Sequence, residues 1–113
     1  MIEGCSFGRM VIDGQTHTAD LVIYPDGRVE GPWYRKSGHR LSKDDINELM
    51  ESRPDVIIAG TGVNGLVRPD KGLGEFLSGK GIRFISAPNQ EAMEVYNELS
   101  SRLRVGACFH LTC

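Results

Sequence analysis

The spacing of hydrophobic residues divides the chain into two parts. In the first third, segments rich in Val, Ile, Tyr and Thr surround two Asp-Gly pairs, Asp13-Gly14 and Asp26-Gly27. Asp-Gly accommodates the positive φ angles of tight hairpin turns, so the pattern predicts an antiparallel β-meander. Its expected strands are residues 9–12, 16–24 and 28–34. Because both faces of the middle strand carry apolar side chains, we expect the sheet to be covered on more than one side.

Beyond residue 40 the pattern changes to helices that alternate with buried strands. Ser42 and Asp45 resemble a capping box at a helix start, and an apolar stripe at helical spacing follows until Pro54 stops the helix. The unbroken apolar run at 55–59 is typical of a strand that is covered on both faces. The same reasoning predicts a helix capped by Asp70 that ends at Gly79 or Gly81, a strand at 82–86, a helix capped by Asn89 and a strand at 105–111.

These elements predict the fold class. Helical crossovers between consecutive strands imply parallel pairing and right-handed connections. We therefore expect an α/β fold of the mixed α+β kind with three layers, in which the antiparallel β-meander joins a small parallel β-α-β-α-β layer. A length of 113 residues fits a single domain over residues 1–113, and no repeat or linker divides it.

Composition narrows the classes of protein. Hydrophobic residues make up 40% of the chain and charged residues 25%, which is ordinary globular usage and argues against a membrane protein or a disordered one. A formal net charge of -2 provides no positive field, so a nucleic-acid partner is not expected. Cys5, Cys108 and Cys113 are an odd number without paired spacing, which favours reduced thiols and a cytoplasmic location. No secretory leader and no membrane partner are expected.

The carboxyl ends of the predicted parallel strands offer the best candidate for a ligand site. One strand leads into Gly60-Thr61-Gly62, and the next leads into a loop from Ser86 to Asn89. Ligands of open parallel sheets bind beyond these strand ends. A helix start at Asn89 would add free N–H groups, which favour an anionic or carbonyl-bearing ligand.

Gly60, Gly62 and Gly65 match the glycine spacing of a dinucleotide-binding loop. The surrounding sequence does not fit such a loop. Residues 66–69 separate the glycines from the next helix, and no acidic residue ends the following strand, where one would bind the ribose. We therefore predict no cofactor. The leading alternative is a structural turn that needs the positive φ angles of glycine.

His39 follows a segment that holds Trp33 and Arg35. In one interpretation His39 is a general acid or base and Arg35 holds an anion, because imidazole titrates near neutral pH. In the other, which we favour, His39 is a loop histidine that bonds to the backbone, and Trp33 lies in the core. Both interpretations remain open at this stage.

Cys108 and His110 point to the same face of the last strand. A metal site there would need further ligands from Cys5, His17 or His39, and nothing in the spacing requires one, so no metal is predicted. Nothing near Cys113 clearly activates its thiol. The usual hydrolase, nucleotide-binding and metalloprotease motifs are missing, so no class of enzyme is indicated.

Several short motifs, taken together, resemble one known family. They are Cys5-Ser6-Phe7-Gly8, Trp33 with Gly38-His39, Ile58-Ala59-Gly60-Thr61-Gly62, Tyr96-Asn97 and Phe109-His110-Leu111-Thr112-Cys113. The family is the uncharacterised domain shared by small archaeal and bacterial proteins, the adipogenesis-associated domain protein of animals and a mitochondrial complex I assembly factor. The chain looks like a short stand-alone archaeal member. The resemblance implies a three-layer fold of mixed β and α structure, and it brings neither an established activity nor agreed catalytic residues.

Two hypotheses about function follow. The first is a non-catalytic binding or assembly module, whose partner is another protein or a second copy of the chain. The second is a protein or enzyme that binds a small molecule or an anion in the crevice, with contacts from the candidate residues. Those candidates are Arg35, His39, Gly60, Thr61, Gly62, Ser86 and Asn89.

Overall fold

The computed structural model describes all 113 residues and arranges the strands in three sheets. The strands are β1 (Ile2–Ser6), β2 (Arg9–Ile12), β3 (Gln15–His17), β4 (Leu21–Ile23), β5 (Val29–Glu30), β6 (Arg40–Leu41), β7 (Val56–Gly60), β8 (Arg68–Pro69), β9 (Arg83–Ala87) and β10 (Val105–Phe109). The helices are the 3₁₀ turn η1 (Lys43–Ile46), α1 (Asn47–Glu51), α2 (Leu73–Ser78) and α3 (Asn89–Leu99). None of these helices is both long enough and apolar enough to span a membrane.

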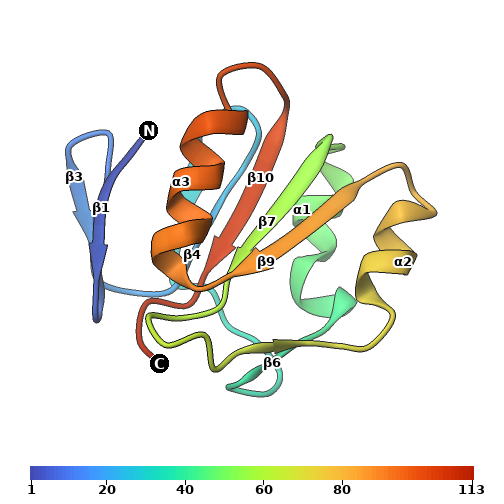
Figure 1. The fold of residues 1–113 in the computed structure, drawn as a ribbon, viewed down its shortest axis with the longest axis horizontal. Coiled ribbons are helices and arrows are strands. Elements are labelled where there is room, and N and C mark those ends of the chain that lie inside the picture. Colours follow the sequence, from blue (N-terminus) through green and yellow to red (C-terminus); the bar gives the residue numbers. More distant parts are fainter.

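The central sheet has the strand order β5-β4-β10-β7-β9, and Figure 1 shows its strands β4, β10, β7 and β9. β7 pairs in parallel with β10 and β9, as the helical crossovers predicted, and β4 runs antiparallel to β10. Every residue of β7 and β10 is buried, which agrees with the unbroken apolar run predicted at 55–59. The mixed α and β fold predicted from the sequence is therefore confirmed.

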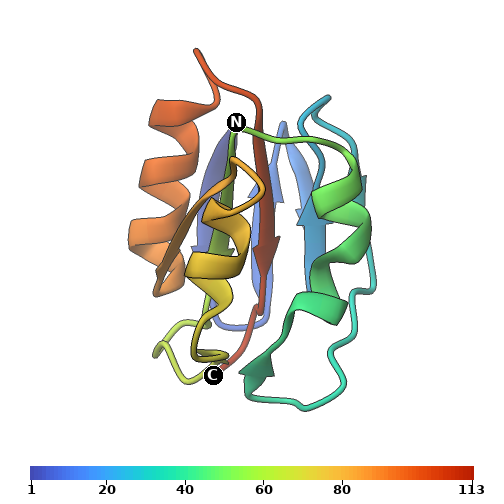
Figure 2. The ribbon, with the colours of Figure 1, turned by 90° about the vertical axis from the view of Figure 1, so that its right-hand side faces the viewer.

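The central sheet is covered on both faces by different elements. Figure 2 shows α3 on one side of the sheet and α1 on the other. On the α3 side, Ala92 and Tyr96 of the helix pack with Met10 of the small sheet β1-β2-β3 against the strands. On the opposite side, Leu49 of α1 and Leu77 of α2 pack against the other faces of the same strands. Alternate side chains of the central strands thus pack into two separate hydrophobic cores, one on each face of the sheet.

The predicted meander is split between two sheets. The expected strand at 16–24 breaks into β3 and β4, and only β4 enters the central sheet, whereas β3 pairs with β2. The break leaves Asp20 directly before β4, where its carboxylate accepts a hydrogen bond from the backbone N–H of Leu111. β1 was not predicted, because its sequence Ile-Glu-Gly-Cys-Ser contains no apolar alternation.

Two predicted helix caps are wrong. The N-cap of α2 is Gly72 in a left-handed conformation, and the Asp70 carboxylate instead pairs with Arg40. Asn89 is the first residue of α3 rather than its cap, and its side chain bonds to other segments. At η1, by contrast, the Asp45 carboxylate accepts the backbone N–H of Ser42, as a capping box requires.

Candidate functional site

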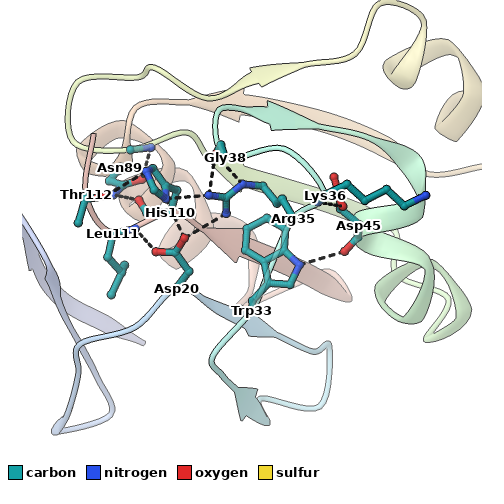
Figure 3. A network of polar contacts seen from close by, with 11 residues as sticks. Asp20, Trp33, Arg35, Lys36, Gly38, Asp45, Asn89, His110, Leu111 and Thr112 are labelled. Carbon is teal, nitrogen blue, oxygen red and sulfur yellow. Dashed lines mark hydrogen bonds and ion pairs between the residues drawn. The ribbon is translucent and has the colours of Figure 1, made fainter.

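A cluster of polar side chains lies where the chain leaves the carboxyl end of β10 (Figure 3). The backbone N–H of His110 continues the parallel pairing by donating to the carbonyl of Gly60. This pairing places His110 at the carboxyl end of the two central strands β7 and β10. Its side chain meets Asp20, which precedes β4, and Arg35, which lies between β5 and β6.

Asp20 is the hub of the cluster. Its Oδ2 atom accepts hydrogen bonds from His110 Nδ1 at 2.7 Å and from Arg35 Nη1 at 3.1 Å, and its Oδ1 atom accepts the N–H of Leu111 at 2.8 Å. Burial on its own would raise the pKa of Asp20. The hydrogen bonds that it accepts from His110, Leu111 and Arg35 outweigh burial and lower the pKa of Asp20. The carboxylate is thus held in its charged form.

Arg35 is locked by contacts on every side. Its side chain is only 5% exposed and forms an ion pair with Asp20. Nε and Nη2 both donate to the carbonyl of Gly38, and the guanidinium carbon lies 4.8 Å from the ring centre of Trp33. The indole of Trp33 in turn donates to the carbonyl of Asp45. These contacts hold the guanidinium of Arg35 in one place within the protein, which supports a role in positioning its neighbours.

The contacts of His110 assign the tautomer of its ring. A nitrogen that lies 2.7 Å from a carboxylate oxygen carries the shared hydrogen, so Nδ1 is the donor to Asp20. Arg35 Nη2, which lies 3.0 Å from the same nitrogen, then makes a close contact and not a second hydrogen bond. Nε2 is left with its lone pair and accepts the hydroxyl of Thr112 at 3.1 Å. The ring of His39 packs against this imidazole edge-on, with 5.8 Å between ring centres.

The glycine loop predicted as a ligand site directs its hydrogen bonds into the protein. The N–H of Thr61 donates to Ala87, and Gly62 exchanges hydrogen bonds with Asn89 through its N–H and its carbonyl. The amide of Asn89 also donates to the carbonyl of His110 at 2.7 Å. Gly60 lies against the ring of Phe109, where an added Cβ would come within 2.2 Å. These contacts support the structural role for the loop, and ligand binding there remains a prediction.

The structure brings together some of the predicted site residues and separates others. Arg35 and His39 both contact His110, and Asn89 joins the glycine loop to the backbone of His110. Ser86 is exposed on β9 and makes no contact with the polar cluster. His39 is exposed, and its backbone carbonyl accepts the N–H of Arg68.

Sequence reasoning missed Asp20, Thr112 and the place of Cys113. Asp20 belongs to no motif, and only the break between β3 and β4 brings it to His110. Cys108 was the expected neighbour of His110, but its side chain lies in the core, where burial raises the pKa of the thiol to about 12. Cys113 instead lies near the rings of His39 and His110.

A groove of about 680 Å³ shares Arg35 with this cluster. It runs between the segment that follows β5 and the helical segment of η1 and α1. Its lining is formed by Val22, Tyr24, Glu30 and residues 32–36 and 44–49. Tyr34 projects from this wall with 80% of its surface exposed.

The chain matches one protein family model and is similar to several solved structures. A family model described as "Protein of unknown function (DUF498/DUF598)" matches residues 2–110. A conserved hypothetical protein from Pyrococcus horikoshii OT3 is 28% identical, with a TM-score of 0.84 and coverage of 100% of this chain and 99% of that one. A protein named MT938 is 31% identical, with a TM-score of 0.84 and coverage of 100% and 98%. A protein from Xanthomonas campestris, 19% identical with a TM-score of 0.78 and coverage of 98% and 83%, shares the fold.

Proposed function

The chain belongs to the family of proteins of unknown function DUF498/DUF598, and from its own geometry we propose that it is a non-catalytic binding module. The groove beside β5 receives an extended, basic segment of a partner protein. The observation that carries this proposal is an open groove of about 680 Å³ whose lining includes the exposed Tyr34, the partly buried Trp33 and the buried Tyr24. Aromatic side chains are enriched in protein interfaces because they bury a large area and lose little conformational entropy.

The edge of the central sheet supports an extended partner. β5 is the end strand of the sheet and pairs on one side only, with β4. An end strand presents unpaired N–H and C=O groups, to which an added strand can bind. The two residues of β5 lead directly into the aromatic wall of the groove. A bound segment would therefore pair with the sheet and place its side chains against Trp33 and Tyr34.

The charge of the groove favours a basic segment. Four carboxylates line it, from Glu30, Asp44, Asp45 and Glu48, against two cationic side chains. Arg35 pairs with Asp20, Lys36 pairs with Asp44, and Glu30 pairs with Arg28 beside the groove. Asp45 and Glu48 are the two carboxylates of the lining that have no cationic partner. The lining thus carries an excess of two negative charges, and complementary charge steers a partner and selects against acidic ones.

Photocrosslinking from the groove tests this function. A photoreactive phenylalanine analogue replaces Tyr34 in one variant and Glu91, an exposed residue on α3, in a matched control. In cells of the source organism, we expect Tyr34 to give a crosslink to a defined protein that Glu91 does not give. The crosslinked segment, made as a peptide, should change the fluorescence of Trp33, the single tryptophan, and should bind more weakly as salt is added.

Three results would contradict the proposal. The first is the same crosslinks from both positions, and the second is crosslinks at Tyr34 to an acidic segment. The third is a peptide whose binding is unaffected by Trp33→Ala or Glu48→Lys. If Tyr34 crosslinks only to a second copy of the chain, the groove mediates self-association and the proposal of a separate partner protein is wrong.

We further propose that this binding module takes part in the assembly of a protein complex. This proposal draws on the resemblance to the domain of a complex I assembly factor, and the same resemblance suggests a stand-alone protein of the archaeal type. We propose the cytoplasm as its location because all three cysteines are free, and a reducing compartment keeps thiols in that state.

A further inference from the structure

We propose that His39, His110 and Cys113 form a binding site for a zinc ion. No cofactor or metal is expected from the sequence, because the three residues come from separate segments and share no spacing motif. The fold brings their donor atoms, one from each side chain, to within 4.8 Å of one another. Two imidazole nitrogens and a thiolate are a ligand set that Zn²⁺ prefers.

The ligand atoms lie close to the arrangement that a zinc ion needs. Zinc–nitrogen bonds of about 2.0 Å and zinc–sulfur bonds of about 2.3 Å place tetrahedral ligands roughly 3.3 to 3.5 Å apart. The separations among the three atoms, which are at most 4.8 Å, therefore have to shrink by up to about 1.5 Å. His39 is exposed and Cys113 is half-buried, so the proposed site requires rotation of these two side chains and no change in the central sheet. Three protein ligands leave the fourth position open for water or another small ligand.

His110 is already oriented as a metal ligand. Its Nδ1 atom donates to the Asp20 carboxylate, which leaves Nε2 as the nitrogen that can bind an ion. A carboxylate behind a ligating histidine fixes the ring and makes the opposite nitrogen a better donor. The hydroxyl of Thr112, now 3.1 Å from Nε2, turns away when an ion binds. Asp20 is thus a positioning residue of the site.

The surrounding charges accommodate a cation. The guanidinium of Arg35 contacts His110, and its ion pair with Asp20 offsets its charge. A thiolate at Cys113 adds the negative charge that a divalent ion requires. Metal ligands bind in their deprotonated forms, so binding of zinc releases the thiol proton to solvent.

The glycine loop holds Cys113 in place for this role. The carbonyl of Cys113 accepts hydrogen bonds from the N–H groups of Asn64 and Leu66. Gly62 has a φ of +110°, and a Cβ at this position would come within 2.2 Å of the carbonyl carbon of Cys113. Only glycine at position 62 allows the chain to pass so close. Gly62 was predicted to contact a ligand directly. In the proposed site its role is to leave room for Cys113, which binds the metal.

Titration of the reduced protein with Co²⁺ and then with Zn²⁺ tests the site. We expect one Co²⁺ per chain, with visible bands typical of tetrahedral cobalt and a thiolate-to-cobalt charge-transfer band, and displacement by Zn²⁺. His39→Ala and Cys113→Ala should each weaken binding by at least about 100-fold, beyond the usual effect of losing a supporting group. Cys113→Ala should also abolish the charge-transfer band. Asp20→Asn should weaken binding by about 10- to 100-fold.

The matched controls are substitutions of a cysteine and a histidine that lie outside the site. Cys5→Ala and His17→Ala, in the sheet β1-β2-β3, should leave the affinity unchanged. The proposal is overturned if the protein binds no Co²⁺ with one-to-one stoichiometry. It is also overturned if His39→Ala or Cys113→Ala binds as tightly as the unaltered chain, because the ion would then lie elsewhere. His39 is exposed and outside the packed core, so its loss tests the site without unfolding the protein.

Discussion

Removal of the Asp20 carboxylate is expected to destabilise the whole domain. Asp20→Ala deprives three groups of their acceptor, and one of them, the guanidinium of Arg35, is only 5% exposed. Removing one partner of a buried ion pair costs about 3 to 5 kcal/mol. Because Asp20 itself keeps 19% of its side-chain exposure, we take the lower end, about 3 kcal/mol. At roughly 2.1 cal/mol/K of unfolding entropy per residue, a chain of 113 residues would melt about 13 °C lower.

Urea unfolding followed by far-UV circular dichroism measures this loss, with thermal melting as a second measurement. Fluorescence is less suitable because Trp33 packs against Arg35 and would sense its movement directly. The matched control is Asp44→Ala, which breaks an exposed ion pair with Lys36 and should leave the midpoint unchanged. A loss below about 1 kcal/mol for Asp20→Ala would refute the reasoning, since Asp20 would then behave as an ordinary surface carboxylate.

The contribution of Asp20 should also depend on pH in a defined direction. Its pKa is lowered in the folded state from an ordinary value of 3.8, so the unfolded chain binds the proton more readily. The stabilisation is therefore fully present above pH 3.8 and disappears as the pH falls through the lower pKa of the folded state. The difference in unfolding free energy between the two proteins should shrink on acidification below that pH. A constant difference would mean that lost packing, not charge, explains the variant.

One further substitution tests the contact of the glycine loop with the segment after β10, and one chemical treatment tests the core. Gly62→Ala should destabilise the protein by about 2 kcal/mol or more, because alanine pays for the left-handed backbone and also meets the carbonyl of Cys113; a melting temperature equal to that of the unaltered chain would contradict this. In thiol labelling of the native protein, Cys108 should stay unmodified until the chain unfolds, because it is buried and its pKa is raised to about 12. Mass spectrometry of labelled peptides identifies the site, and early labelling of Cys108 would disprove its burial.

The sequence predicted the parts of the fold that depend on local pattern. The apolar run of β7 and the helical spacing of α3 are properties of short windows, and both elements lie where the pattern put them. The split of the meander was not predictable in this way. Residues 16–24 read as one strand, and the reason for the break is the contact of Asp20 with Leu111, which lies 91 residues along the chain.

The candidate site was less predictable than the fold for the same reason. The glycine loop and Asn89 stood out as motifs, but their polar groups bond to each other and to the backbone of His110. Asp20 and Cys113 have no local signal, because their roles arise only when β4 and β10 pair. Pairing between distant strands is a tertiary effect, which single-sequence patterns describe poorly.

The order of the strands has a consequence for folding during synthesis. β10 follows every other strand along the chain, yet it lies in the middle of the central sheet, between β4 and β7. Until the ribosome releases this segment, β4 and β7 each have an open edge, and open edges invite pairing with other chains. The central sheet can therefore close only after β10 has been translated, and rapid pairing of β10 with β4 and β7 removes these open edges.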